Sequence, residues 1–158
     1  MSDVICYTAS MQIKTDTVTQ QARSVYLDIL LNKTEPILYE DDQWFVLFAK
    51  TPCNEGHLLV IPKIKESDFF RLPGTVLDRG FRIATQLSTL LSEVYQPPRV
   101  GVFIKGFTND DHAHIHVTPL YDTTDMNVGP SHPRPPLPVE QMWVIAKKLQ
   151  AKIHEQLK

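Results

Sequence analysis

Three segments of the chain repeat apolar residues at the three- and four-residue spacing of an amphipathic helix. The first segment is 16–32, and the second begins after Pro73 and ends before Pro97, since proline cannot continue a helix. The third is 139–157. We therefore predict three helices, of which the second has the most regular apolar stripe: Leu77, Phe81, Ala84, Leu87, Leu90, Leu91 and Val94.

Short runs rich in β-branched and aromatic residues lie between these helices and are typical of strands. Acidic, turn-forming residues separate the first run from the second, and a loop rich in Gly, Thr, Asn and Asp joins the last two. Strands joined so closely pair antiparallel. We predict an α+β fold with a mainly antiparallel sheet of about five strands. The runs are Ile37 to Tyr39, Trp44 to Phe48, His57 to Ile61, Val100 to Ile104 and His112 to Pro119.

The length and composition predict a single domain over 1–158, because 158 residues with 42% hydrophobic content suffice for one ordinary core. No segment repeats with the period of a solenoid or propeller. Residues 1–15 read as an arm that precedes the first helix. The segment 130–138 reads as an extended connector to the last helix, because it holds five of the chain's 12 prolines.

The formal net charge of −2 gives no overall basic field of the kind that nucleic-acid polymers or anionic membranes attract. An anionic ligand must therefore be bound locally. The chain shows neither a secretory leader nor a run of about 20 apolar residues, so we expect a cytoplasmic protein that does not contact a membrane. Its two cysteines, Cys6 and Cys53, have no CxxC partner, which fits a reduced compartment and argues against a structural zinc site.

Three histidines alternate with other residues in the last predicted strand: His112, His114 and His116. Because side chains on a strand alternate between faces, all three imidazoles are expected on one side, with neighbours roughly 6.6 Å apart. One straight strand cannot easily bring three such rings to a single metal ion, since metal–nitrogen distances are about 2.1 Å. A row of titratable rings would also be costly as mere packing.

A nucleophile with a helper on each side fits this spacing better than a metal site does. A neutral imidazole can attack phosphorus through one nitrogen while a hydrogen bond orients the other. We therefore interpret His114 as the nucleophile. His116 would donate a proton or a hydrogen bond to the departing oxygen, and His112 would help to fix the ring and tautomer of His114.

The row closely resembles the signature of the histidine triad family, in which three histidines alternate with apolar residues; Thr118 is its only polar departure here. A second matching block covers 37–42 and 56–63, so the resemblance spans about 37–120. It implies a nucleotide hydrolase or nucleotidyl transferase whose middle histidine, here His114, forms a nucleotidyl-histidine at an α-phosphate. It also implies that His57 is the fourth active-site histidine.

The expected substrate is a small nucleotide, such as a dinucleoside polyphosphate or a nucleoside phosphoramidate, and no cofactor or metal is required. Alignment on His57 puts Ala49 where many relatives carry an acid that binds the ribose hydroxyls. The other substrate-binding candidates are apolar residues that shape the base pocket and polar residues near the phosphates: Phe45, Leu47, Lys105, Thr108 and Asn109.

Two other readings remain open at this stage. The chain could be a nucleotide-binding protein of this family without turnover, which Ala49 and the altered loop before His112 suggest. It could also be a metalloenzyme that uses two histidines of the row together with His57. The apolar stripe of the second helix is as compatible with a homodimer as with packing on the chain's own sheet.

Overall fold

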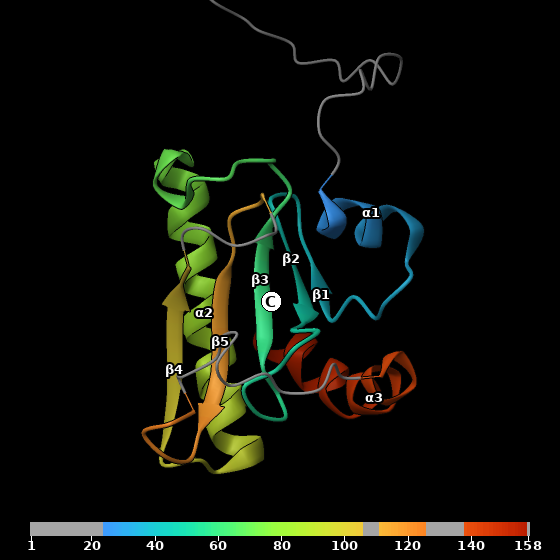
Figure 1. Ribbon diagram of the computed structural model, residues 1–158, viewed down its shortest axis with the longest axis vertical. Coiled ribbons are helices and arrows are strands. Elements are labelled where there is room, and N and C mark those ends of the chain that lie inside the picture. The colour runs from blue at the N-terminus through green and yellow to red at the C-terminus, as the bar shows by residue number, and fades with distance from the viewer. Residues whose placement is uncertain (1–23, 106–110, 126–137, 158) are drawn as a thin grey trace, which may run out of the picture.

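The computed structural model describes residues 24–105, 111–125 and 138–157 of the chain. Its centre is a five-stranded antiparallel sheet in the order β1-β2-β3-β5-β4 (Figure 1). This sheet, together with three α-helices, confirms the predicted α+β class. The strands are β1 (Tyr39–Glu40), β2 (Trp44–Phe48), β3 (Leu58–Pro62), β4 (Arg99–Ile104) and β5 (Ile115–Leu120).

The helices are α1 (Val25–Asn32), α2 (Gly74–Tyr95) and α3 (Val139–Gln156), with a short 3-10 turn, η1 (Phe69–Arg71), before α2. The sequence placed α2 and α3 correctly to within a residue or two. The first helix was predicted over 16–32; residues 16–23 lie outside the described part of the chain, and within that part α1 begins at Val25. Ser24 has an extended backbone and its hydroxyl accepts a hydrogen bond from the Tyr26 N–H, so it is the N-cap.

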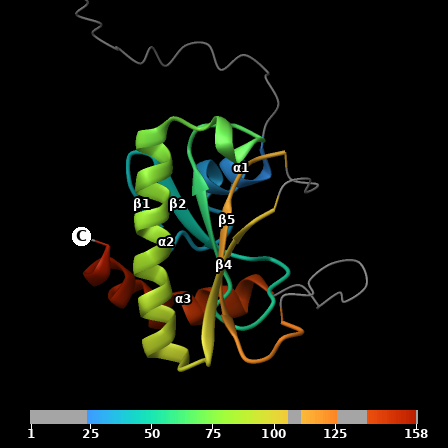
Figure 2. The same ribbon diagram turned by 90° about the vertical axis from the view of Figure 1, so that its left-hand side faces the viewer.

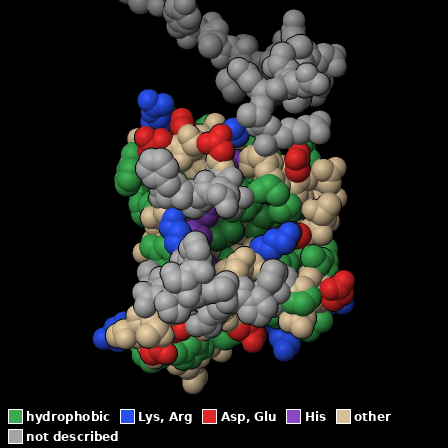
Figure 3. Space-filling view, viewed as in Figure 1, with side chains coloured by type: hydrophobic (Ala, Val, Ile, Leu, Met, Phe, Trp, Pro, Cys, Tyr) green, Lys and Arg blue, Asp and Glu red, His purple; other side chains and the backbone are tan. Residues whose placement is uncertain are grey.

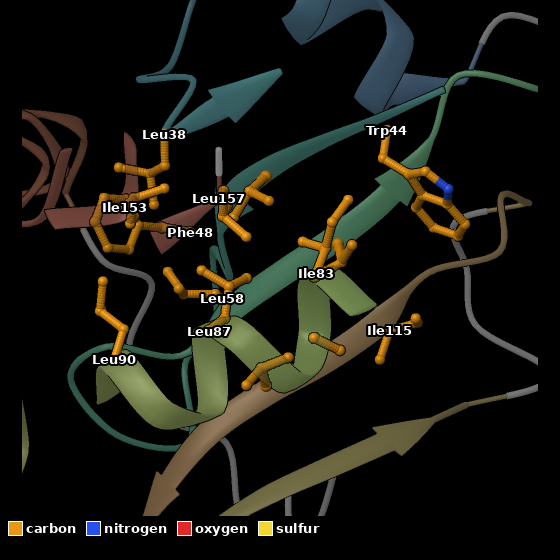
Figure 4. Packing of buried hydrophobic residues seen from close by; sticks show 14 of the residues in the cluster. Leu38, Trp44, Phe48, Leu58, Ile83, Leu87, Leu90, Ile115, Ile153 and Leu157 are labelled. Atoms are coloured by element: carbon orange, nitrogen blue, oxygen red, sulfur yellow. The ribbon is translucent and has the colours of Figure 1, made fainter. Parts of the chain in front are cut away.

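One face of the sheet is covered by α2 and α3 and holds the larger apolar cluster (Figures 2 and 4). Alternate residues of β2 and β3 point into it, as the two-residue period of a strand requires. Trp44 anchors the cluster, since its indole is fully buried and donates to the Val76 carbonyl at 3.0 Å. Gly80 lets α2 approach the ring closely, because a Cβ there would lie 2.5 Å from a Trp44 carbon.

The buried stripe of α2 is rotated from the predicted one. Val76, Gly80 and Ile83 face the sheet, whereas Phe81 is 45% exposed. The pattern at Phe81 was misleading because the sheet side has to accommodate the Trp44 indole, which leaves room for a glycine and not for a phenyl ring. The second half of the stripe, from Ala84 to Leu91, is buried as predicted.

The opposite face of the sheet is covered by α1 over β2 and β3. Tyr26 and Leu30 pack there on the residues of β2 and β3 that point away from α2. This smaller cluster comprises Tyr26, Leu30, Phe45, Leu47, Ala49, Leu59 and Ile61. We call this side the α1 face, and the side under α2 and α3 the α2 face.

Strand β5 begins at Ile115, so the predicted strand from His112 to Pro119 starts three residues too early. His112 and His114 lie in the segment that enters the sheet, where strand alternation does not apply. Ala113 donates its N–H to the Glu66 carbonyl at 2.6 Å instead of to a neighbouring strand. The three histidines therefore do not form the straight row that the strand spacing predicted.

Candidate active site

The α1 face carries the histidines where α1 leaves the sheet uncovered. The strand register aligns four residues across the sheet: Leu47 opposite Leu59, Leu59 opposite His116, and His116 opposite Phe103. The first two are apolar and lie near α1. The last two are aromatic, and their rings stack with centroids 4.5 Å apart and planes 7° from parallel. Along this row the side chains thus change from aliphatic ones near α1 to a histidine that can take part in chemistry.

His57 reaches this row from the loop between β2 and β3. Gly56 precedes it with φ +84°, and a Cβ there would lie 2.6 Å from the Tyr95 ring, so the position requires glycine. The backbone around His57 is held by hydrogen bonds from its N–H to the Asn54 carbonyl at 3.1 Å and from the Ala49 N–H to its carbonyl at 2.9 Å. The ring is therefore rigidly placed.

A chain of hydrogen bonds sets the proton positions of two histidines. The Cys53 N–H donates to Nδ1 of His57 at 2.9 Å, which leaves the His57 proton on Nε2. That Nε2–H lies 3.0 Å from Nδ1 of His116 and donates to it. The proton of His116 is therefore on Nε2. Within the described part of the chain this buried Nε2 has no hydrogen-bond partner.

Both rings are held neutral by their surroundings. Burial, together with repulsion from the nearby Lys105 and His114, lowers the pKa of His57 to about 3. Burial likewise lowers the pKa of His116 to about 2, with additional repulsion from His114, His57 and Lys105. His57 is 3% exposed and His116 is 8% exposed. Neutral imidazoles are the form that the hydrogen-bond chain requires.

His114 lies beside His116, with ring centroids 4.6 Å apart. Its Nδ1 is 2.9 Å from the His112 carbonyl, and since a carbonyl only accepts, Nδ1 carries the proton. In the neutral ring the lone pair is then on Nε2, which is the atom that a nucleophile needs. Tyr26 of α1 packs edge-on against this ring with centroids 5.2 Å apart.

His112 performs a different role from the one predicted for its side chain. Its Nε2–H donates to the Pro62 carbonyl at 2.8 Å, and its Nδ1 lies 2.6 Å from the Ser24 hydroxyl. The ring therefore joins the start of α1 to the end of β3. It is the backbone carbonyl of His112, and not its ring, that fixes the tautomer of His114.

A cavity of about 600 Å³ opens on the α1 face and is lined by three of the four histidines, His57, His114 and His116. Leu47, Lys105 and Ala49 also line it. Figure 3 shows histidine side chains on this side of the molecule between basic side chains. The ammonium of Lys105 lies 5.6 Å from the centre of the Phe103 ring, which places a positive charge beside the histidines.

Two further sequence candidates, Phe45 and His112, do not line the cavity. Phe45 is fully buried one register step away, opposite Ile61, and packs under α1 without lining the cavity. The ring of His112 lies behind the cavity wall, held by Ser24 and Pro62. Thr108 and Asn109 lie outside the described residues.

Sequence reasoning missed four residues that shape the site. Ser24 binds His112 across 88 positions of sequence, and Tyr26 packs on His114. Phe103 stacks on His116, and Glu35, which is buried, lines the cavity. The two-residue spacing of Phe103 in β4 and Lys105 just after it gave a signal that they share a face; the other contacts had no local signal.

The described residues contain no group of three or more His, Cys, Asp or Glu side chains arranged to hold a metal ion. The rings of His112 and His116 are engaged by partners on different sides of His114. None of the helices in the described residues is long and apolar enough to cross a bilayer.

Comparison with known proteins agrees with this geometry. The family model described as HIT domain matches residues 31–123, more than half of the chain, so the protein belongs to the HIT (histidine triad) family. This membership supports a nucleotide-binding protein or a nucleotide hydrolase or transferase. The predicted family is thus confirmed.

Solved structures show the same fold. A Hit-like protein from Bartonella henselae is 20% identical over 81% of this chain and 94% of its own, with a TM-score of 0.68. A hypothetical histidine triad nucleotide-binding protein from Sulfolobus tokodaii is 19% identical over 82% and 91%, also with a TM-score of 0.68. A zinc-bound histidine triad family protein from Mycobacterium smegmatis is 19% identical over 82% and 93%, with a TM-score of 0.62.

Proposed function

We propose that the protein is a nucleotide hydrolase or nucleotidyl transferase in which Nε2 of His114 attacks the α-phosphorus of a nucleotide derivative. The observation that carries this proposal is the pair of proton positions in the cavity. The His112 carbonyl holds the His114 proton on Nδ1, and the His57 ring holds the His116 proton on Nε2. A nucleophilic lone pair and a hydrogen-bond donor therefore stand on adjacent rings.

In the first step the His114 lone pair forms the Nε2–P bond, and the bond from phosphorus to the bridging oxygen breaks. The electron pair of that bond leaves with the oxygen. The imidazole gains positive charge as it becomes nucleotidylated, and the His112 carbonyl, which accepts the Nδ1–H at 2.9 Å, stabilises that charge. No metal ion is needed for this attack.

The leaving oxygen accepts a hydrogen bond from Nε2–H of His116 in this scheme. A buried donor without a partner strongly favours an acceptor when one arrives. His116 is neutral, so it stabilises the leaving group as a donor and does not have to lose its proton. This favours leaving groups that depart as phosphate anions, as in dinucleoside polyphosphates. A phosphoramidate would need a proton from another source for its amine.

In the second step water, or another acceptor, attacks the same phosphorus. The P–N bond breaks and its electron pair returns to Nε2 of His114, which regenerates the neutral ring. With water the products are a nucleoside monophosphate and one proton. Lys105 lines the cavity beside the histidines and would attract the anionic substrate.

Trapping the covalent intermediate tests this proposal directly. We expect that brief mixing with diadenosine tetraphosphate and denaturation without acid adds the mass of one adenylyl group, which acid then removes. His114→Ala should abolish the addition. His154→Ala is the matched control, because this exposed histidine of α3 bonds only locally, with its Nδ1 2.8 Å from the Gln150 carbonyl.

An adduct that persists in His114→Ala would contradict the assignment of the nucleophile. Nucleotide binding without an adduct or turnover across a panel of dinucleoside polyphosphates, phosphoramidates and nucleotide sugars would favour the non-catalytic alternative. Activity that disappears on dialysis against a chelator and returns with a divalent metal would favour the metalloenzyme.

A further inference from the structure

The segment that carries His114 is not held by the sheet. Strand β5 pairs with its neighbours only from Ile115 onward, so the residues from His112 to His114 have no ladder of strand hydrogen bonds. The carbonyl of His112 nevertheless has to stay in place, because it holds the His114 proton on Nδ1. This peptide unit therefore needs anchors other than strand pairing.

Two anchors hold the His112 carbonyl, one on each side along the chain. On one side the Ala113 N–H, which belongs to the same peptide unit, donates to the Glu66 carbonyl at 2.6 Å. On the other side the His112 ring lies between the Pro62 carbonyl, 2.8 Å from Nε2, and the Ser24 hydroxyl, 2.6 Å from Nδ1. The ring is 2% exposed, so water is a poor substitute for either partner.

The proton positions show which group donates to the His112 ring. Burial lowers the pKa of His112, which keeps the ring neutral. Its Nε2–H donates to the Pro62 carbonyl, so Nδ1 carries the lone pair. The Ser24 hydroxyl is therefore the donor to Nδ1. Its oxygen still accepts from the Tyr26 N–H at 3.2 Å, so one hydroxyl serves both the ring and the first turn of α1.

Capping of α1 explains only half of this arrangement. An N-cap needs an acceptor, and aspartate or asparagine serves as well as serine. The proton of the Ser24 hydroxyl contributes nothing to the cap, and its acceptor is His112, at a separation of 88 positions. The same turn of α1 carries Tyr26, whose ring packs edge-on against His112 and His114 with centroids 6.0 and 5.2 Å away. The start of α1 is thus tied to the nucleophile's support.

We propose that Ser24 is a positioning residue of the active site, whose hydroxyl clamps the His112 ring and thereby keeps the His112 carbonyl where it holds the His114 proton on Nδ1. This inference rests on the proposed function in that His114 is the nucleophile. It deepens that function by naming a residue outside the histidine pattern. Ser24 does not line the cavity, so it acts through His112 and not by contact with the substrate.

The test begins with two substitutions that separate the clamp from the helix cap. Ser24→Gly removes the hydroxyl but costs α1 little, because glycine is itself a good N-cap. Its kcat for diadenosine tetraphosphate should fall by about 5- to 10-fold, the worth of one buried hydrogen bond, with KM within about threefold of the wild type. Ser24→Thr keeps a hydroxyl and should restore kcat to within about threefold of the wild type.

Imidazole ¹H–¹⁵N correlation spectra give a readout that does not depend on turnover. They distinguish Nδ1–H from Nε2–H rings, and His112→Ala and His114→Ala assign the signals. The wild type should show His112 as Nε2–H and His114 as Nδ1–H. In Ser24→Gly the His114 ring should also populate the Nε2–H form, whereas Ser24→Thr should keep the wild-type pattern. A general loss of stability would not move a proton within a folded ring.

Ser88→Ala is the matched control, because it removes the same hydroxyl from α2, where Ser88 donates to the Ala84 carbonyl at 2.9 Å. It should change neither kcat nor the imidazole spectra. A double-mutant cycle adds a second check. In the His112→Ala background Ser24→Gly should change kcat by less than about twofold, because the ring that the hydroxyl clamps is already gone.

An unchanged His114 proton distribution in Ser24→Gly would overturn the assignment, whatever happens to turnover. A loss of kcat that is as large in Ser24→Thr, or that adds fully to the effect of His112→Ala, would also overturn it. The spectra separate this inference from the proposed reaction. A His114 proton that redistributes in Ser24→Gly, in a protein that never forms an adduct, would leave the role of Ser24 supported and the covalent mechanism refuted.

Discussion

The two faces of the sheet are built from the same strands but are packed differently. On the α2 face, side chains from β2, β3 and β5 meet α2 and α3 in an apolar cluster with Trp44 at its centre. On the α1 face the same strands present Leu59 and His116 side by side, and a short helix covers only part of the surface. One face is filled, whereas the other keeps a cavity of about 600 Å³.

The two faces differ in the buried polar groups that lower the stability of the fold. The α1 face holds a buried donor without a partner on His116, and it places the acidic side chain of Glu35, whose pKa is raised by burial, against the cavity. Each lowers the stability of the fold, because buried polar groups are expected to be paired. The α2 face supplies the stability that tolerates them through its larger apolar cluster, although the side-chain oxygens of Gln86 and Gln156 are also buried there without a partner. Substitutions on the two faces should therefore separate activity from stability.

The largest effect is expected from the nucleophile. His114→Ala should reduce kcat by at least about 10⁴-fold, because losing a covalent nucleophile removes the pathway itself. The midpoint of thermal unfolding should stay close to that of the wild type, since the ring lines a cavity and is not part of the core. Steady-state turnover together with calorimetry checks both parts, and residual activity within tenfold of the wild type would refute the role.

The opposite pattern is expected on the α2 face. Leu87→Ala removes a side chain that is 1% exposed in the large cluster and should destabilise the protein by about 2–5 kcal/mol. Its kcat per folded molecule should change by less than about threefold, because Leu87 lies on the far side of the sheet from the histidines. Urea unfolding gives the stability, and active-site titration gives the folded fraction. A large loss of kcat at unchanged stability would show that the faces are coupled.

An intermediate effect is expected from the hydrogen-bond chain. His57→Phe keeps an aromatic ring but removes the donor to Nδ1 of His116, so the His116 proton is no longer held on Nε2. We expect kcat to fall by about 10- to 100-fold, which corresponds to one hydrogen bond in a buried site. Substrates with good leaving groups should lose less than those with poor ones. Equal losses across a leaving-group series would argue that His57 only supports the fold.

A smaller effect concerns stability in acid. The pKa values of His57 and His116 are lowered to about 3 and about 2 in the folded state, whereas the unfolded chain titrates near 6.5. Below pH 6.5 the unfolded state therefore binds more protons, and stability falls as the pH decreases toward 3, by up to about 1.4 kcal/mol per pH unit for each histidine. In His57→Phe the stability should fall less steeply as the pH decreases. Urea unfolding between pH 4 and 8 measures it.

The smallest effect is expected at Glu35, where the sign is opposite to that of the histidines. The folded-state pKa is raised above its ordinary 4.5, so the folded protein holds the proton more tightly and stability decreases as the pH rises above that value. Glu35→Gln should remove this decrease, so the variant should gain stability relative to the wild type as the pH rises from 4 to 8. A variant that is less stable than the wild type at pH 7 would show that the carboxylate is not a cost to the fold.

Local patterns predicted much of the fold. Strand β2 has the predicted bounds of Trp44 to Phe48, and α3 ends one residue before the predicted end. The family and its fold followed from the histidine pattern and the block around His57; the match to the HIT domain model confirms the family, and the solved structures confirm the fold. These features are contiguous in sequence, so propensity and periodicity suffice to detect them.

Features that depend on distant residues could not be predicted. The ring of His112 binds Ser24, and no periodicity connects positions 88 residues apart. The segment around Glu35 has no repeating pattern, so nothing in the sequence indicated that its side chain would be buried against a cavity. The start of β5 at Ile115, three residues later than predicted, also followed from tertiary contacts, since Ala113 bonds to the Glu66 carbonyl and not to a strand.

The proton positions of the active site originate in the main chain. The Cys53 N–H fixes the proton of His57, and through it that of His116, while the His112 carbonyl fixes the proton of His114. Substitutions of the fully buried Cys53 by residues of similar size change a side chain and leave its amide in place, so the proton positions should survive them. Proline is the exception, because it has no N–H to donate. The chemistry of the histidines thus depends at this position on the backbone amide and not on the thiol.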